Sequence, residues 1–249
     1  MTTTSARSVI LLVYRGHTVV GVAPDFAPTR AAWHAVAEWV LAPARHAEFG
    51  RIGLRATPGG FGTPPFAGER VLRVDHDELV VTVDGVDART RLTTLADAAA
   101  FVGIPPGTHT GVYTPATTWS PDAPLAIDGR VAPLLADWFA SAAAWLDTVW
   151  AEATAEDAPT MVQLWPEHFD MAVDLGDAKR GRRANYGASP GDELHPEPYL
   201  YVGPWDLARR GDATFWNAPF GASLPYRAAV DEPGAALAFF RRGKELLHG

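Results

Sequence analysis

The sequence predicts an α+β fold, in which antiparallel strands form one or two sheets and helices pack on one face of them. Strand-like segments are grouped in runs and helix-like segments lie outside those runs, which is typical of α+β proteins. Asp84-Gly85 separates two alternating segments and marks a hairpin. The order helix, strands, helix occurs twice, in residues 28–103 and 130–248. We therefore expect one compact unit of 249 residues with two similar halves, 1–115 and 116–249.

The chain before the hairpin contains two strand patterns with a long helix pattern between them. The apolar run Val9–Val13 predicts a strand. Apolar residues recur at helical spacing from about Pro28 to Phe49, with Thr29 placed to cap the helix and Pro43 to break or kink it. Charged and apolar residues alternate in Arg51–Thr57, which is the pattern of a half-buried strand.

The hairpin and a short helix complete the first half. Apolar residues alternate in Glu78–Asp84 and again in Val86–Leu92, on either side of the turn. Thr94 has the position of a helix cap before Leu95–Val102, and Gly103 can adopt the left-handed conformation that ends a helix.

The second half begins with a long amphipathic helix over Val131–Ala153, whose apolar stripe includes Trp138 and Trp145. Large rings on one apolar face indicate a helix packed on a sheet, in preference to a cofactor site. Strand patterns and a last helix follow at Met161–Trp165, Phe169–Leu175, Tyr199–Val202, Thr214–Asn217 and, for the helix, about Pro233 to Leu247.

Composition excludes several classes of function. The net charge is −8, lysine occurs only at Lys179 and Lys244, and no long basic run is present, so we expect no nucleic-acid partner. The absence of cysteine excludes disulfides, thiol nucleophiles and cysteine-ligated metals. No apolar run approaches the roughly 20 residues of a membrane span, and no secretory signal is recognised. We therefore expect no membrane partner and a cytoplasmic location; the oligomeric state stays open.

Two glycine-containing motifs have structural interpretations. Gly187-Ala188-Ser189-Pro190-Gly191 matches the spacing of a serine-hydrolase elbow, but Pro190 lacks the N–H that such an elbow donates to the oxyanion. We interpret Ser189 as part of a turn. The segment Pro58–Pro65 lacks the ending of a phosphate loop, so it connects strands or forms a flexible rim over a pocket.

The segment Trp165–Leu175 is the most informative one. In a strand, Phe169, Met171, Val173 and Leu175 face the core, which places His168, Asp170, Ala172 and Asp174 on the opposite face. A histidine beside a carboxylate is suited to general acid/base chemistry, because imidazole titrates near neutral pH. We predict His168 and Asp170 as catalytic residues, with Asp170 orienting His168. The residues predicted to bind the substrate are Trp165, Glu167, Asp174, Asn185, Tyr186, Asp192, Glu197, Tyr199 and Tyr201.

Alternatives remain open at this point. His195 or Glu197 would complete a divalent-metal site beside His168, although no familiar ligand spacing is present, so metal and cofactor are unknown. The polar face would also suit a sheet surface in contact with water. As a third possibility, the protein is a non-catalytic interaction domain that uses an exposed aromatic patch of Trp165, Trp205, Phe215, Trp216 and Phe220.

Four segments carry a resemblance to a known group of proteins: "RIGLRATPGGFGTPPF", "QLWPEHFDMAV", "NYGASPGDE" and "PEPYLYV". Together they resemble a family of uncharacterised bacterial proteins, a domain of unknown function that is common in actinobacteria. The resemblance covers most of the chain and implies a shared fold and a shared site. The resemblance implies no activity. From the residues themselves, the favoured function is a small-molecule binding protein or enzyme with a polar pocket on the His168/Asp170 strand face.

Overall fold

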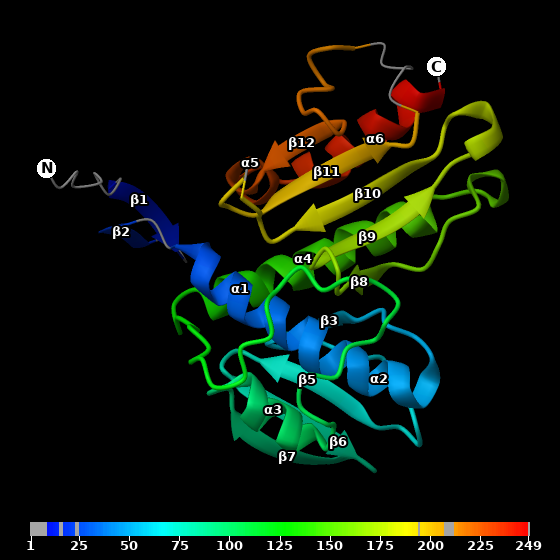
Figure 1. Ribbon diagram of the computed structural model, residues 1–249. Helices are drawn as coiled ribbons and strands as arrows, with labels where there is room; N and C mark the ends of the chain where they lie inside the picture. Colours follow the sequence, from blue (N-terminus) through cyan, green and yellow to red (C-terminus); the bar gives the residue numbers. More distant parts are fainter. Residues whose placement is uncertain (1–8, 15–16, 23–24, 194, 207–211, 249) are drawn as a thin grey trace, which may run out of the picture.

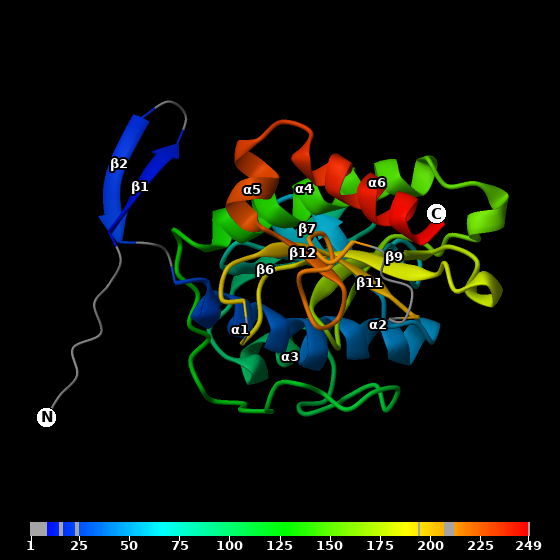
Figure 2. The same ribbon diagram turned by 90° about the horizontal axis from the view of Figure 1, so that it is seen from above.

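A computed structural model describes residues 9–14, 17–22, 25–193, 195–206 and 212–248. It shows the predicted α+β fold, with two antiparallel sheets of five strands each and a separate two-stranded hairpin (Figure 1). The hairpin consists of β1 (Val9–Tyr14) and β2 (His17–Val22), and it stands away from the rest of the molecule in both ribbon views (Figures 1 and 2). None of the helices in the described part of the chain combines the length and apolar composition of a membrane span.

The first sheet is a meander, in which each strand pairs with the next one along the chain. The predicted turn between its last two strands is confirmed, because Asp84 and Gly85 have φ angles of 52° and 77°. Such left-handed pairs match the twist of a tight hairpin. The strands are β3 (Arg55–Thr57), β4 (Gly60–Gly62), β5 (Val71–Asp75), β6 (Glu78–Val83) and β7 (Val86–Arg91).

The second sheet repeats this meander in the other half of the chain. Its strands are β8 (Gln163–Trp165), β9 (Asp170–Leu175), β10 (Ala184–Ser189), β11 (Tyr199–Pro204) and β12 (Ala222–Pro225). The two sheets meet at their first strands, where Leu54 and Leu164 exchange two backbone hydrogen bonds of 2.8 Å.

The helices divide into two groups, with α1, α2 and α3 on one side of the molecule and α4, α5 and α6 on the other (Figure 2). Along the chain, each five-stranded sheet is preceded and followed by helices: α1 and α2 before the first and α3 after it, α4 before the second and α5 and α6 after it. The bounds are α1 (Phe26–Val36), η1 (Ala37–Leu41), α2 (Ala42–Phe49), α3 (Leu95–Val102), α4 (Ala132–Ala151), η2 (Ala155–Asp157), η3 (Ala178–Arg180), α5 (Tyr226–Asp231) and α6 (Ala235–His248).

The predicted helix of residues 28–49 is one helical run whose start and interior differ from expectation. Asp25 caps it by accepting from the backbone N–H of Ala27, whereas Thr29 lies buried inside the helix and accepts from the N–H of Asp128. The run is not broken at Pro43; instead the preceding turn, η1, widens to a π-helix. Proline lacks the N–H that closes a regular helical hydrogen bond, and the π turn lies immediately before the helix that contains Pro43.

The core lies where α1 and α4 meet the inner faces of both sheets. Phe139 of α4 contacts Phe61 of β4, Phe169 before β9 and Trp33 of α1, with ring centroids 6.1, 5.5 and 6.4 Å away. Trp138 is also buried, as the helical stripe predicts, and Trp145 is partly buried against it with ring centroids 5.8 Å apart, so the stripe of α4 packs on the core. Burial of such rings is a large part of the stability of a domain.

A buried glutamate holds the irregular segment between α3 and α4. Glu38 of η1 is 0% exposed, and its carboxylate accepts hydrogen bonds from the backbone N–H of Ala116 (2.8 Å) and from the N–H (2.7 Å) and hydroxyl (2.6 Å) of Thr117. Trp39 donates to Thr117 as well. The segment therefore has a fixed path despite its lack of regular structure.

Several elements were not expected from the sequence. Strands β5 and β10 were missed, and the predicted strand at Thr214–Asn217 is wrong, because this segment forms turns and β12 follows it. In particular, Ser189 does not lie in a turn, because it is the last residue of β10.

Candidate functional site

The outer face of the second sheet carries a hollow of about 520 Å³, which we call the Asp170 pocket. Its volume lies within the range of small-molecule sites. The described residues that line it are His168, Asp170, Asn185, Ser189, Asp192, Tyr199, Tyr201, Gly203, Pro204, Trp205 and Phe220. The pocket thus combines residues of β9, β10 and β11, which is the strand face that the sequence indicates.

Strand pairing explains why this face is hollow. Ala172, Gly187 and Tyr201 lie opposite one another on β9, β10 and β11. A Cβ atom at Gly187 would lie only 2.3 Å from Cζ of the Tyr201 ring, so this ring lies across β10 in the space that a side chain would fill. The Tyr201 hydroxyl thereby reaches over one strand and donates a hydrogen bond to Oδ2 of Asp170.

Asp170 is the buried carboxylate of the pocket. Asp170 is 7% exposed. Its Oδ1 atom has no hydrogen-bond partner among the residues that the structure describes. Burial raises the pKa of the Asp170 carboxyl, although the hydrogen bond from Tyr201 and the nearby His168 act in the opposite direction. An unpaired buried carboxylate oxygen destabilises a fold, so its retention calls for a functional explanation.

Tyr201 complements this carboxyl as a permanent hydrogen-bond donor. Burial and the neighbouring Asp170 raise the pKa of the Tyr201 hydroxyl well above its usual value. The phenol therefore stays protonated at physiological pH and continues to donate to Asp170.

The loop after β10 forms a second polar group at the pocket. The Tyr199 hydroxyl donates to Oδ2 of Asp192 at 2.7 Å, and Oδ1 of Asp192 accepts from the backbone N–H of His195 at 2.6 Å. Arg30 of α1 holds this loop by donating to the backbone carbonyls of Asp192 and Pro196. The first half of the chain therefore fixes a wall of the pocket in the second half.

The turn before β9 is positioned by α1 as well. The His34 ring stacks on Phe169 with centroids 5.1 Å apart, and its Nε2 atom lies 2.8 Å from the carbonyl oxygen of Pro166. Phe169 has a left-handed φ of 51° and is buried, as predicted, but it precedes the strand. His168 lies on this turn beside Asp170, and its side chain is exposed.

The predicted relation between His168 and Asp170 needs correction. Both line the pocket, as expected, but the structure shows no hydrogen bond between their described side chains, and Tyr201 takes the place of His168 as the partner of Asp170. The reason is local: His168 belongs to the turn and β9 begins only at Asp170. Asp170 therefore does not orient His168 in this structure.

Four of the predicted substrate-binding residues line the pocket, namely Asn185, Asp192, Tyr199 and Tyr201, together with both catalytic candidates, His168 and Asp170. Tyr186 does not line the pocket, because it is 1% exposed and packs on Phe240 of α6 on the core face. Its neighbour Asn185 faces the pocket, because successive side chains along a strand point to opposite faces of the sheet.

The other predicted binding residues lie outside the pocket lining. Asp174 forms an ion pair with Arg183 (3.0 Å), and Glu197 is exposed in the loop. Trp165 is half-buried in the edge strand β8. Glu167 has a buried Oε2 atom. The pKa of the nearby Tyr113 hydroxyl is raised mainly by burial, and the charge of Glu167 contributes to this increase. The ion pair with Arg183 holds Asp174 away from the pocket lining, and Glu167 lies in the turn before β9.

Phe220, Trp205, Gly203, Pro204 and Ser189 line the pocket but were not predicted as binding residues. Phe220 reaches the site from the chain before β12, which no period-two pattern announces. For the other lining residues, the sequence offered one indication: Gly187 in β10 and Gly203 in β11. A glycine inside a strand indicates that another group approaches the backbone closely.

The aromatic patch proposed as an interaction surface is not a single exposed surface. Trp216 is buried, and Phe215 packs on Phe239 of α6 with centroids 5.3 Å apart. Trp205 is 60% exposed, but its indole N–H donates to Asn185 at the pocket. These rings therefore belong to the core or to the pocket.

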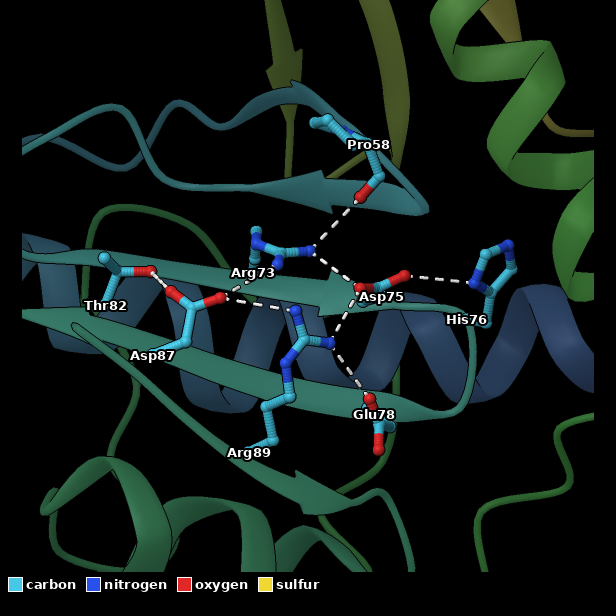
Figure 3. A network of polar contacts seen from close by, with 8 residues as sticks. All are labelled: Pro58, Arg73, Asp75, His76, Glu78, Thr82, Asp87 and Arg89. Carbon is cyan, nitrogen blue, oxygen red and sulfur yellow. Dashed lines mark hydrogen bonds and ion pairs between the residues drawn. The ribbon is translucent and has the colours of Figure 1, made fainter. Parts of the chain in front are cut away.

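The carboxylates on the outer face of the first sheet have arginine partners, unlike Asp170 on the second sheet (Figure 3). Asp75 accepts from both Arg73 and Arg89 at 3.0 Å. Burial raises the pKa of the Asp75 carboxyl, but the hydrogen bonds from these arginines outweigh it, so the pKa is lowered. Arg89 also bonds Glu78 and Asp87. Carboxylates on this face are neutralised by arginines, whereas Asp170 on the second sheet is bonded by a tyrosine.

A metal centre is not apparent in the described part of the chain. No three histidine, aspartate or glutamate side chains there come together in a way that suits a metal ion. His195, which the sequence offered as a ligand, stacks on Tyr199 with ring centroids 4.6 Å apart.

The three segments "QLWPEHFDMAV", "NYGASPGDE" and "PEPYLYV" contribute β8 to β11 and so surround the Asp170 pocket. Comparisons with protein-family models, with curated proteins and with solved structures find no match for this chain.

Proposed function

We propose that this protein binds a small organic molecule in the Asp170 pocket, with Asp170 as the group that anchors the ligand. The observation that carries the proposal is the buried carboxyl of Asp170, which lines a hollow of ligand size and has one oxygen without a hydrogen-bond partner among the described residues. A side chain that only solubilised a sheet surface would be exposed. The family resemblance, which stays a prediction, is consistent with this proposal because three of its four segments contribute residues to the pocket lining.

The test is a ligand-observed NMR screen with a fragment library of neutral, cationic and anionic compounds. We expect fragments that bind the wild-type protein to lose affinity in Asp170→Asn and in Tyr201→Phe. The loss of a hydrogen bond to a charged group is about 1.5 to 3 kcal/mol, which is roughly a 10- to 100-fold change in Kd.

Asp75→Asn is the matched control, because it removes a carboxylate from the outer face of the other sheet and should leave fragment binding unchanged. The proposal is wrong if no fragment binds, or if every fragment binds equally well to wild type and to both pocket variants.

A catalytic use of the same pocket is a second candidate. Its basis is the raised pKa of the buried Asp170 carboxyl beside His168, since perturbed carboxyls in hollows are typical of general acids and bases. Conversion of a bound fragment, followed by NMR over time, would support catalysis. In that case Asp170→Asn should abolish turnover, and His168→Gln should reduce it.

A further inference from the structure

We propose that the ligand of the Asp170 pocket is an organic cation whose ammonium group lies between Asp170 and the rings of Tyr199, Tyr201 and Phe220. This inference rests on the proposed small-molecule function and names the chemical class of the ligand. Three independent observations carry it: the geometry of the rings, the charge of the lining, and the contrast with the first sheet.

The three rings form a triangle. The centroids of Tyr199 and Tyr201, of Tyr199 and Phe220, and of Tyr201 and Phe220 are each 6.3 Å apart. A cation placed over such a triangle lies within about 6 Å of all three centroids, the range in which ring faces attract cations. Recognition of ammonium groups commonly uses clusters of this kind.

The charge of the lining favours a positive ligand. Among the described lining residues the acidic ones are Asp170 and Asp192, and none is a lysine or an arginine. Arg30 contacts the same loop, but its guanidinium donates to the backbone carbonyls of Asp192 and Pro196, and Arg30 is not among the lining residues. An anionic ligand would therefore meet two carboxylates and no described lysine or arginine in the lining, whose one described histidine is His168.

The first sheet shows how this fold neutralises a carboxylate with its own residues. There Asp75 accepts hydrogen bonds from Arg73 and Arg89 (Figure 3). On the second sheet Asp170 is more deeply buried, receives one hydroxyl hydrogen bond, and keeps Oδ1 without a partner in the described structure. We infer that the cation that complements Asp170 comes from the ligand.

The experiment uses four probes of one shape and different charge: benzylamine, benzyltrimethylammonium, benzyl alcohol and benzoate. Each is titrated into the ¹⁵N-labelled protein at neutral pH and fixed ionic strength, and Kd is obtained from the shifts of the pocket amides, such as those of Gly187 and Gly203. We expect benzylamine to bind at least about tenfold more tightly than benzyl alcohol, and benzoate not to bind.

Two variants separate the contributions of charge and rings. Asp170→Asn should weaken benzylamine at least about tenfold and leave benzyl alcohol nearly unchanged. Phe220→Leu should weaken benzyltrimethylammonium more than benzyl alcohol, because the cation–π contribution is lost. Asp75→Asn should change none of the four affinities.

The outcomes separate this inference from the proposed function. If benzyl alcohol or benzoate binds in the pocket as tightly as the two cations, the ligand is not a cation, but the pocket remains a small-molecule site. If none of the four probes shifts the pocket amides, the cation inference is overturned, and the fragment screen alone decides whether the pocket binds anything.

Discussion

Neutralising Asp170 should stabilise this protein, which is the opposite of what most substitutions of buried residues do. Asp170→Asn keeps the shape of the side chain and an oxygen that can accept from Tyr201, but it removes a negative charge from a buried site. Because burial raises the pKa of the Asp170 carboxyl, the folded protein disfavours the charged form. A group that destabilises the fold and is nevertheless present fits a role in binding.

The pH dependence follows from the same shift. The folded state holds the Asp170 proton to higher pH than the unfolded chain, whose carboxyl titrates near pH 4. The wild type therefore loses stability as pH rises from about 4 to the pKa of the folded state, and this difference persists at higher pH. Asp170→Asn lacks this loss.

The expected gain can be estimated from this linkage. Burial raises the pKa of the Asp170 carboxyl, so we expect Asp170→Asn to unfold with a higher free energy than wild type at pH 7.5. Each 1 kcal/mol of this gain should raise the melting temperature by about 2 to 4 °C for a chain of this size. At pH 4 the two proteins should be nearly equal.

Urea unfolding followed by tryptophan fluorescence between pH 4 and 8 measures both free energies. Asp75→Asn is the control of opposite sign, because the pKa of Asp75 is lowered by its arginine partners despite burial. It should destabilise the protein by about 1 to 2 kcal/mol at pH 7.5 and less at low pH. If Asp170→Asn were instead as destabilising at pH 7.5 as Asp75→Asn, the carboxyl would be a structural hydrogen-bond partner and our reasoning would be refuted.

Further substitutions test other parts of the structure. Gly187→Ala should displace the Tyr201 ring and weaken fragment binding at least about tenfold with little loss of folding, which titration and circular dichroism would check; unchanged binding would contradict the described ring position. Glu38→Gln should lower the free energy of unfolding by about 2 to 3 kcal/mol, because a buried amide N–H₂ then faces a backbone donor; urea titration measures this. Phe139→Ala should cost about 3 to 5 kcal/mol in the same assay, and a loss under 1 kcal/mol would place the core elsewhere.

Much of the fold was predictable because its elements carry local signals. The hairpin turn at Asp84-Gly85, the cap of α3 at Thr94 and the apolar stripe of α4 depend only on neighbouring residues, and all three are confirmed. Strand β10 was not predictable in this way. It lies in the middle of its sheet but consists largely of small residues, and Gly187 leaves room for a ring from another strand.

The site was predictable only in part. The alternation in β9 and β11 correctly places Asp170, Tyr199 and Tyr201 on one face, because side chains alternate strictly along a strand. The partner of Asp170 was not predictable, since it depends on a tyrosine that crosses a neighbouring strand. Phe220 was missed because it enters from a segment without a repeating pattern.

The contact between Leu54 and Leu164 has a consequence for the order of folding. In both meanders each described strand pairs with the next one in the chain, so these pairs close short loops, whereas the Leu54–Leu164 bridge joins residues from the two halves. Contacts between distant residues carry the larger loop-closure entropy and slow folding. We expect the two meanders to form first and to join late, so that weakening the joint accelerates unfolding more than it slows folding.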